Sequence, residues 1–117
     1  MASDPHDSPL LTWHLVPAEE WQATHADAPW FPVAFPRDGF IHTTHTAQEV
    51  AAAGTRYYKD DPRPYLAVLI DLRQLASPWR YDGNRRFPHI YGALNREAVI
   101  AVHPAPRTPD GTFLPPS

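Results

Sequence analysis

Residues 65–72 read Tyr-Leu-Ala-Val-Leu-Ile-Asp-Leu and give the strongest strand signal in the chain. Apolar side chains at consecutive positions fall on both faces of a strand, which is typical of a strand covered on both sides. A turn rich in Asp and Pro, residues 60–63, precedes the run. We therefore predict that residues 65–72 form the central strand of a sheet.

Five more strands and two helices are predicted around this strand. Short segments rich in β-favouring residues mark the strands, at residues 10–16, 40–43, 79–81, 87–91 and 98–103. A short helix is predicted from Ala18 to about Asp27. A second is predicted over residues 47–58, where Thr46 and Glu49 form a capping box and Val50, Ala53 and Tyr57 form an apolar stripe. This order predicts an α+β fold with mostly antiparallel sheets and two short helices.

The length of 117 residues is that of one domain, which we place at residues 10–104. The 15 prolines gather in three places. Those at the ends predict a flexible N-terminus over residues 1–9 and a poorly ordered Pro-rich tail over residues 105–117. The middle group lies in an aromatic loop, residues 28–38, for which two interpretations stay open: a loop packed onto the core, or one wall of a ligand cleft.

Composition excludes several classes of protein. The chain has no cysteine, so a disulfide scaffold, a thiolate zinc site and a cysteine nucleophile are excluded. Its net charge is −3 and its ten Lys and Arg residues are scattered, so we expect no nucleic-acid binding. No apolar run approaches the ~20 residues that span a bilayer, so we expect no membrane association and a cytoplasmic location.

Two segments carry residues suited to ligand binding. In residues 39–44, Gly-Phe-Ile-His-Thr-Thr, His42 is followed by the hydroxyls of Thr43 and Thr44 just before a predicted helix N-terminus, which suits a phosphate or a sugar hydroxyl. In residues 87–92, Phe-Pro-His-Ile-Tyr-Gly, His89 and Tyr91 precede a glycine that would let a ligand approach the backbone. With His14 on the first strand, these residues predict a pocket lined by histidines.

These same segments resemble a known family. Residues 12–17 (Thr-Trp-His-Leu-Val-Pro), residues 39–42, the pair Tyr57-Tyr58 and residues 87–92 are similar to the family called domain of unknown function 952, over about residues 10–103. The resemblance implies an ADP-ribosyltransferase-like fold, in which two small antiparallel sheets flank a cleft that holds NAD.

The resemblance also implies roles for individual residues. His14 matches a strand histidine that binds a ribose hydroxyl, and His42 matches a second histidine at a strand end, with Thr44 and His45 where Ser and Thr are common. Transferases often use a glutamate to stabilise the oxocarbenium ion. We find no suitably placed glutamate, and His89 occupies the comparable segment.

We therefore assign His42 and His89 as catalytic candidates. The substrate-binding candidates are His14, Thr43, Thr44, His45, Tyr58 and Tyr91. A tyrosine is expected to stack on the nicotinamide ring. Tyr57 is expected to pack in the core.

The function implied is binding of NAD, as a substrate, or of a related phosphorylated nucleotide, with ADP-ribosyl transfer or glycohydrolase activity. Two alternatives stay open, and with them whether the chain is an enzyme. One is a non-catalytic module that binds a small ligand. The other is a metal site built from His42 and His45 with His14 and His89, although no carboxylate obviously completes it and the spacing is not a recognised one.

Overall fold

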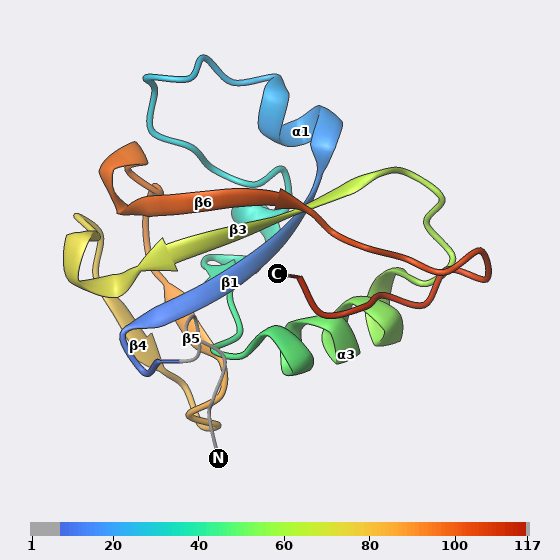
Figure 1. The fold of residues 1–117 in the computed structure, drawn as a ribbon. Coiled ribbons are helices and arrows are strands. Elements are labelled where there is room, and N and C mark those ends of the chain that lie inside the picture. Colours follow the sequence, from blue (N-terminus) through green and yellow to red (C-terminus); the bar gives the residue numbers. More distant parts are fainter. Residues whose placement is uncertain (1–7, 117) are drawn as a thin grey trace.

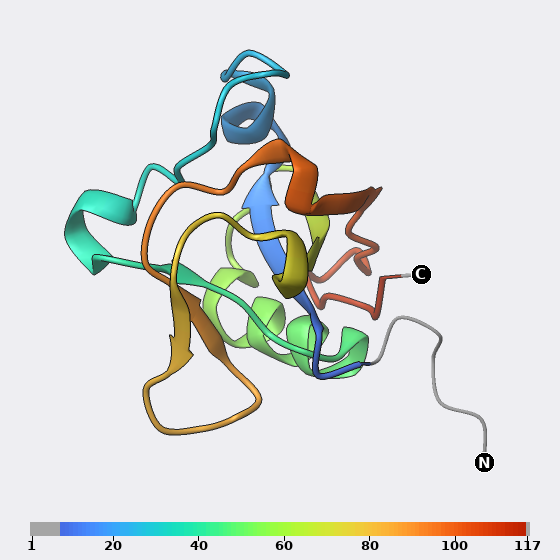
Figure 2. The same cartoon turned by 90° about the vertical axis from the view of Figure 1, so that its left-hand side faces the viewer.

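The computed structural model describes residues 8–116, which form two antiparallel three-stranded sheets. Strand β3, Tyr65–Asp71, is the central strand of the larger sheet. Its strand order is β1-β3-β6, and that of the smaller sheet is β2-β5-β4 (Figures 1 and 2). The strands are β1 Leu11–Pro17, β2 Ile41–His42, β3 Tyr65–Asp71, β4 Trp79–Tyr81, β5 Pro88–Ile90 and β6 Val99–Pro104. The α+β class and the antiparallel sheets are thus confirmed.

Three α-helices and two 3₁₀ turns complete the fold: α1 Ala18–Gln22, α2 Phe35–Asp38, α3 Ala47–Tyr58, η1 Leu72–Gln74 and η2 Arg96–Ala98. Helix α1 ends five residues earlier than predicted. Helix α2 was not predicted; it lies in the Pro-rich loop and ends at Gly39, whose φ of 79° is a left-handed conformation that glycine adopts without strain. None of the helices in residues 8–116 has the length and apolar character needed to cross a bilayer.

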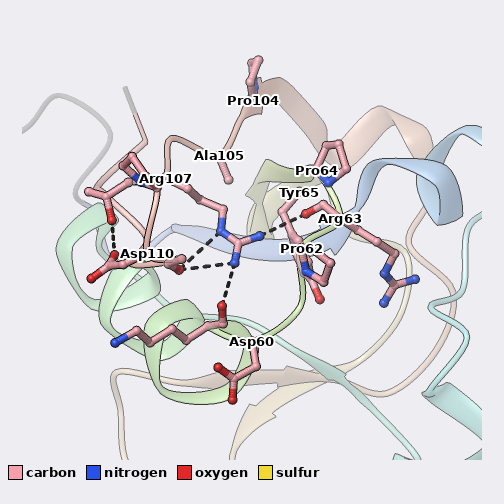
Figure 3. Close-up of a pocket in the computed structure, with 13 residues that line it drawn as sticks. Asp60, Pro62, Arg63, Pro64, Tyr65, Pro104, Ala105, Arg107 and Asp110 are labelled. Carbon is pink, nitrogen blue, oxygen red and sulfur yellow. Dashed lines mark hydrogen bonds between the residues drawn. The ribbon is translucent and has the colours of Figure 1, made fainter.

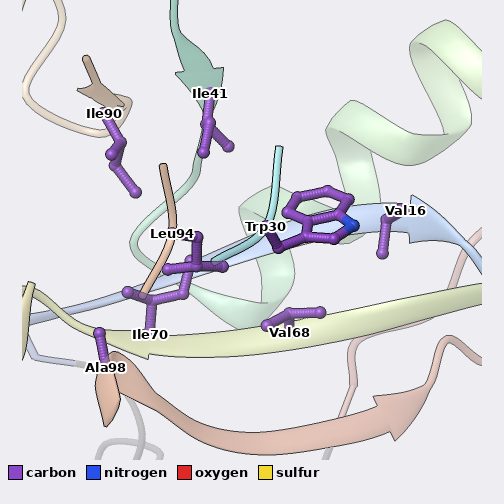
Figure 4. Close-up of a cluster of buried hydrophobic side chains, with 8 residues drawn as sticks. All are labelled: Val16, Trp30, Ile41, Val68, Ile70, Ile90, Leu94 and Ala98. Atoms are coloured by element: carbon purple, nitrogen blue, oxygen red, sulfur yellow. The ribbon is translucent and has the colours of Figure 1, made fainter. Parts of the chain in front are cut away.

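The main core joins the two sheets. Trp30, from the Pro-rich loop, packs with Val16, Val68 and Ile70 of the larger sheet and with Ile41 and Ile90 of the smaller one (Figure 4). Its backbone exchanges two hydrogen bonds with Leu94. The loop thus packs onto the core through Trp30, while other residues of it line a cleft described below. That this cleft holds a ligand stays a prediction.

Helix α3 begins as predicted but turns a different face to the core. The Thr46 hydroxyl accepts a hydrogen bond from the Glu49 N–H at 3.2 Å, which confirms the capping interaction. The buried residues are Ala47, Val50, Ala51 and Gly54, whereas the Tyr57 side chain is 67% exposed. The prediction that Tyr57 packs in the core was therefore wrong. The buried face passes through Gly54, where a Cβ atom would come within 2.8 Å of both Leu15 and Phe113.

The C-terminal segment packs onto the domain. We expected poor order over residues 105–117, but Phe113 is buried and packs against Ala51 and Tyr65. The Arg107 guanidinium lies 4.2 Å from the centre of the Phe113 ring and donates hydrogen bonds to the backbone carbonyls of Lys59 and Arg63, among others (Figure 3). Lys59, Arg63 and Arg107 line a cavity of about 470 Å³ (Figure 3). Of the predicted N-terminal segment 1–9, residues 1–7 lie outside the described residues.

We predict that Arg107→Ala lowers the free energy of unfolding by about 1–3 kcal/mol, because it leaves several backbone carbonyls without their charged donor. Urea denaturation measures the change. The matched control is Arg85→Ala, at an exposed position with no hydrogen bond to another described residue, and it should change stability by less than about 0.5 kcal/mol. Equal effects of the two substitutions would show that Arg107 does not hold the C-terminal segment.

Candidate functional site

One cleft of about 1140 Å³ brings together most of the predicted site residues. Its walls come from strand β1, the segment from Pro32 to Thr44, the exposed face of helix α3, and the residues just before and within β5. The cleft is large enough for a nucleotide-sized ligand. The predicted residues that line it are His14, His42, Thr43, Thr44, Tyr58 and His89.

His14 lies on β1, lines the cleft and is 8% exposed. Its Nδ1 lies 2.6 Å from the backbone carbonyl oxygen of His42. Because a carbonyl can only accept, Nδ1 carries the proton, and the neutral ring keeps Nε2 as an acceptor. Burial lowers the pKa of His14 to about 4, so the ring is neutral at physiological pH. A neutral imidazole with a fixed acceptor is suited to binding a ligand hydroxyl.

His42 and His89 are cross-strand partners on β2 and β5. Their ring centres are 5.8 Å apart. The Phe40 ring contacts both, stacking on His89 at 4.0 Å and lying tilted against His42 at 4.6 Å. All three side chains line the cleft, so the small sheet presents two imidazoles to the same space.

Each of these two histidines is bound by its own carboxylate. His42 Nε2–H donates to Asp38 at 3.1 Å, and His89 Nδ1–H donates to Asp82 at 2.8 Å. Asp38 is also bound by Arg37, which together with His42 holds the pKa of Asp38 below its usual range. Asp82 accepts from Tyr91, from Arg80 and from His89, and these bonds hold its pKa well below the usual range. Both carboxylates are therefore ionised at neutral pH.

Arginine and tyrosine side chains line the rest of the cleft. Arg37, Arg56, Arg63 and Arg86 lie along it with the three carboxylates Glu20, Asp38 and Glu49. Arg56 alone of the four has no carboxylate within 4 Å among residues 8–116. It follows Ala52 and Ala53 on the exposed face of α3 and precedes two tyrosines.

Those tyrosines, Tyr57 and Tyr58, both line the cleft, and their rings are accessible to a ligand. Burial and the Asp38 carboxylate raise the pKa of Tyr58, which keeps its hydroxyl protonated as a donor. The cleft thus combines cations, flat rings and neutral hydrogen-bonding groups.

Three predicted contacts are not brought to the cleft. His45 is buried and both its ring nitrogens are occupied, Nδ1 by the Leu11 carbonyl and Nε2 by the Tyr81 hydroxyl, each at 2.6 Å. Tyr91 points to Asp82 instead of lining the cleft. At Gly92 the close neighbour is the Ser77 side chain, not space for a ligand. In the part of the chain that the structure describes, no three His, Asp or Glu residues gather as metal ligands, so the metal alternative finds no support.

The threonines mainly hold the site together. Thr43 donates its hydroxyl to the Pro88 carbonyl at 2.6 Å, which joins the end of β2 to β5. The backbone of Thr44 exchanges two hydrogen bonds with Trp13 of β1. These contacts fix the two sheets relative to each other and so fix His14 relative to His42.

Sequence reasoning missed two glutamates that line the cleft, Glu20 and Glu49. Glu49 lies in the first turn of α3, where its backbone N–H donates to the Thr46 hydroxyl, and its side chain lines the cleft. Its Oε2 atom is buried with no hydrogen-bond partner among the described residues, and Arg86 Nε lies 3.9 Å away. The capping-box signal located Glu49 but gave no indication that its side chain lines the cleft.

Comparisons with known proteins agree with this architecture. The profile of the family "Protein of unknown function (DUF952)" matches residues 15–102. The crystal structure of protein CC0527 from Caulobacter crescentus is similar, with a TM-score of 0.75, 19% identity, and coverage of 89% of this chain and 93% of that one. Its solution NMR structure gives a TM-score of 0.65 at 20% identity, covering 87% and 90%. At this identity the likeness shows the fold alone. No curated protein matches the chain.

Proposed function

Since the chain belongs to the DUF952 family of proteins of unknown function, we propose its function from its own cleft: it binds NAD or a related phosphorylated nucleotide. The observation that carries the proposal is the joint lining of one cleft by His14, Arg56, Tyr57 and Tyr58. Each of these groups matches one part of such a ligand. The ADP-ribosyltransferase-like classification belongs to this proposal and is supported by the two small antiparallel sheets.

The phosphates would be bound by arginine. A guanidinium binds phosphate oxygens through charge-assisted hydrogen bonds, often in pairs. Arg56 offers this group without first having to leave a carboxylate, whereas Arg37 is engaged by Asp38 at 2.9 Å and Arg63 by Asp61 at 2.7 Å. Arg56 is therefore the first phosphate ligand of the proposed site.

The sugar and the rings would be bound on either side. Nε2 of His14 accepts a hydrogen bond from a ribose hydroxyl, which a neutral ring does without the cost of burying a charge. The accessible faces of Tyr57 and Tyr58 stack on an adenine or nicotinamide ring. A ligand that makes all three contacts must carry phosphate, ribose and base together.

A second candidate function is enzymatic activity on the bound nucleotide, and the position of Glu49 in the cleft favours it. A carboxylate in the cleft is the group that stabilises a positively charged sugar as nicotinamide leaves. With NAD as substrate, ADP-ribosyl transfer or glycohydrolysis would release nicotinamide. A non-catalytic module would bind NAD and leave it intact.

We predict that isothermal titration calorimetry detects binding of NAD, ADP-ribose or AMP, and that Tyr57→Ala and Arg56→Ala each weaken it by about tenfold or more. A ligand at ~100 times its dissociation constant should add about 2.7 kcal/mol to the free energy of unfolding. Chromatography of the incubated NAD then shows whether nicotinamide is released, and Glu49→Gln shows whether that release depends on the carboxylate.

The control is His25→Ala, since His25 is highly exposed and lies outside the cleft. It should bind like the unaltered protein. If none of the three ligands binds, or if the cleft variants bind as tightly as the His25 variant, the cleft is not a nucleotide site.

A further inference from the structure

The two histidines of the small sheet are arranged for proton transfer, not only for binding. His89 donates a hydrogen bond from Nδ1–H to Asp82, so the neutral ring presents Nε2 as a proton acceptor. In His42, Nε2–H donates to Asp38, which leaves Nδ1 for the substrate, as an acceptor in the neutral ring or as an N–H donor in the protonated one. One imidazole is thus set up as a base, and the other can act as an acid.

Their spacing suits a single phosphate group. Ring centres 5.8 Å apart are close enough for one tetrahedral phosphate to contact both imidazoles. Phe40 packs against both rings and limits their rotation. Arg37 binds the same carboxylate as His42, so its positive charge offsets that of Asp38 beside a bound phosphate.

We infer that this pair hydrolyses the cyclic phosphodiester of a nucleoside, an activity that rests on the proposed binding of a phosphorylated nucleotide in the cleft. Water attacks phosphorus while its proton passes to Nε2 of His89. The ring P–O bond breaks, and the leaving oxygen receives a proton from Nδ1 of His42. The products are a nucleoside phosphomonoester and a histidine pair that exchanges one proton with solvent to restart.

The charge of the chain favours a small substrate over a polynucleotide, and a cyclic mononucleotide is the smallest phosphodiester of a nucleoside. A long polynucleotide needs a broad basic surface, but the net charge is −3 and the arginines of the site lie inside one cleft. A small cyclic nucleotide requires only the local contacts described here. Its base would reach the accessible tyrosines of α3.

Asp82 is a positioning residue in this scheme. It does not line the cleft and contacts His89 from outside it, with Arg80 and Tyr91 as its other partners. Asp82→Asn should lower kcat by at least about tenfold with KM nearly unchanged, because the amide no longer fixes the imidazole tautomer. Nitrogen-15 NMR of the histidine rings should show the loss of the Nδ1–H form of His89, a change that a merely structural role would not produce.

The test is the incubation of the full chain with 2′,3′-cyclic AMP and, separately, 3′,5′-cyclic AMP, followed by phosphorus-31 NMR. We expect one or both rings to open, with a bell-shaped dependence of rate on pH. His42→Ala and His89→Ala should each reduce the rate by about 10²-fold or more. His89→Asn keeps a donor for Asp82 and removes the base, so it should be equally slow. His25→Ala should be unaffected.

Folding of each variant is checked from its unfolding midpoint. If neither cyclic nucleotide is opened, or if the His42 and His89 variants keep the rate, the inference is overturned. The calorimetry with NAD runs on the same preparation. Binding without ring opening therefore rejects only the hydrolysis, whereas absence of all nucleotide binding rejects the proposed function as well.

Discussion

Replacement of Trp30 by alanine is expected to lower the free energy of unfolding by about 3–5 kcal/mol, the range for truncating a buried tryptophan. Trp30 is 1% exposed and lies where the two sheets meet, with residues of both around it (Figure 4). Its ring also packs on Trp21 at 5.0 Å and on His14 at 5.4 Å. The cavity left by alanine would open beside His14, which lines the cleft.

The expected loss of stability is large enough to test whether Trp30 joins the two sheets. Domains of this kind are stable by about 5–15 kcal/mol, so the loss is a large fraction of the total. Chemical denaturation followed by circular dichroism gives the change. The matched control is the next residue: Phe31→Ala removes an aromatic ring that is 51% exposed, and its effect should be much smaller. Comparable losses at both positions would contradict the assignment of Trp30 as the joint between the sheets.

Acidification from pH 6.5 to pH 4 is expected to remove about 3 kcal/mol of stability through His14 alone. In the folded protein, burial lowers the pKa of His14 to about 4, whereas an unfolded histidine titrates near its ordinary 6.5. Between these values the unfolded chain takes up a proton and the folded protein does not. The contribution is therefore fully present above pH 6.5 and is lost as the pH falls through the folded pKa.

Urea denaturation at pH 7.5, 6.5, 5.5 and 4.5 measures this dependence. The control variant is His14→Gln, which keeps a polar side chain and removes the titration. Other groups titrate in both proteins, so the difference between the two curves isolates His14. If the curves stay parallel across this range, His14 does not fold as a buried neutral imidazole.

The sequence predicted those parts of the fold that depend on local patterns. The apolar run of β3 predicts a central strand because both of its faces are covered, and the structure places it between β1 and β6. The Thr46–Glu49 signal predicts the start of α3 because capping is a local interaction. In both cases the cause lies within a few residues of the element.

Long-range packing explains what the sequence did not predict. Tyr57 was expected in the core because of its type and spacing, but the buried face of α3 packs on the larger sheet and on Phe113, more than fifty residues later. Segment 105–116 in turn owes its order to Arg107 and to backbone carbonyls of distant residues. Composition alone cannot identify such partners.

In the candidate site too, residues in local motifs were predicted and residues that meet only through long-range packing were not. His14, His42 and His89 stand in strand motifs and were recognised there, and the structure brings all three to the cleft. Asp82 was not predicted as a site residue, since its hydrogen bond to His89 depends on the path of the β4–β5 hairpin. The cleft arginines are scattered along the chain and become neighbours only in the folded protein.

The order of pairing in the larger sheet has a consequence for how the chain folds during synthesis. Strand β3 pairs with β1, about fifty residues earlier, and with β6, the last of the strands in residues 8–116. A nascent chain that still lacks Val99–Pro104 leaves one edge of β3 unpaired and its apolar side chains exposed. Sheets with such distant pairings form slowly, because loop closure must precede the stabilising contacts. The ribosome therefore has to deliver nearly all of the described chain before the walls of the cleft can assemble.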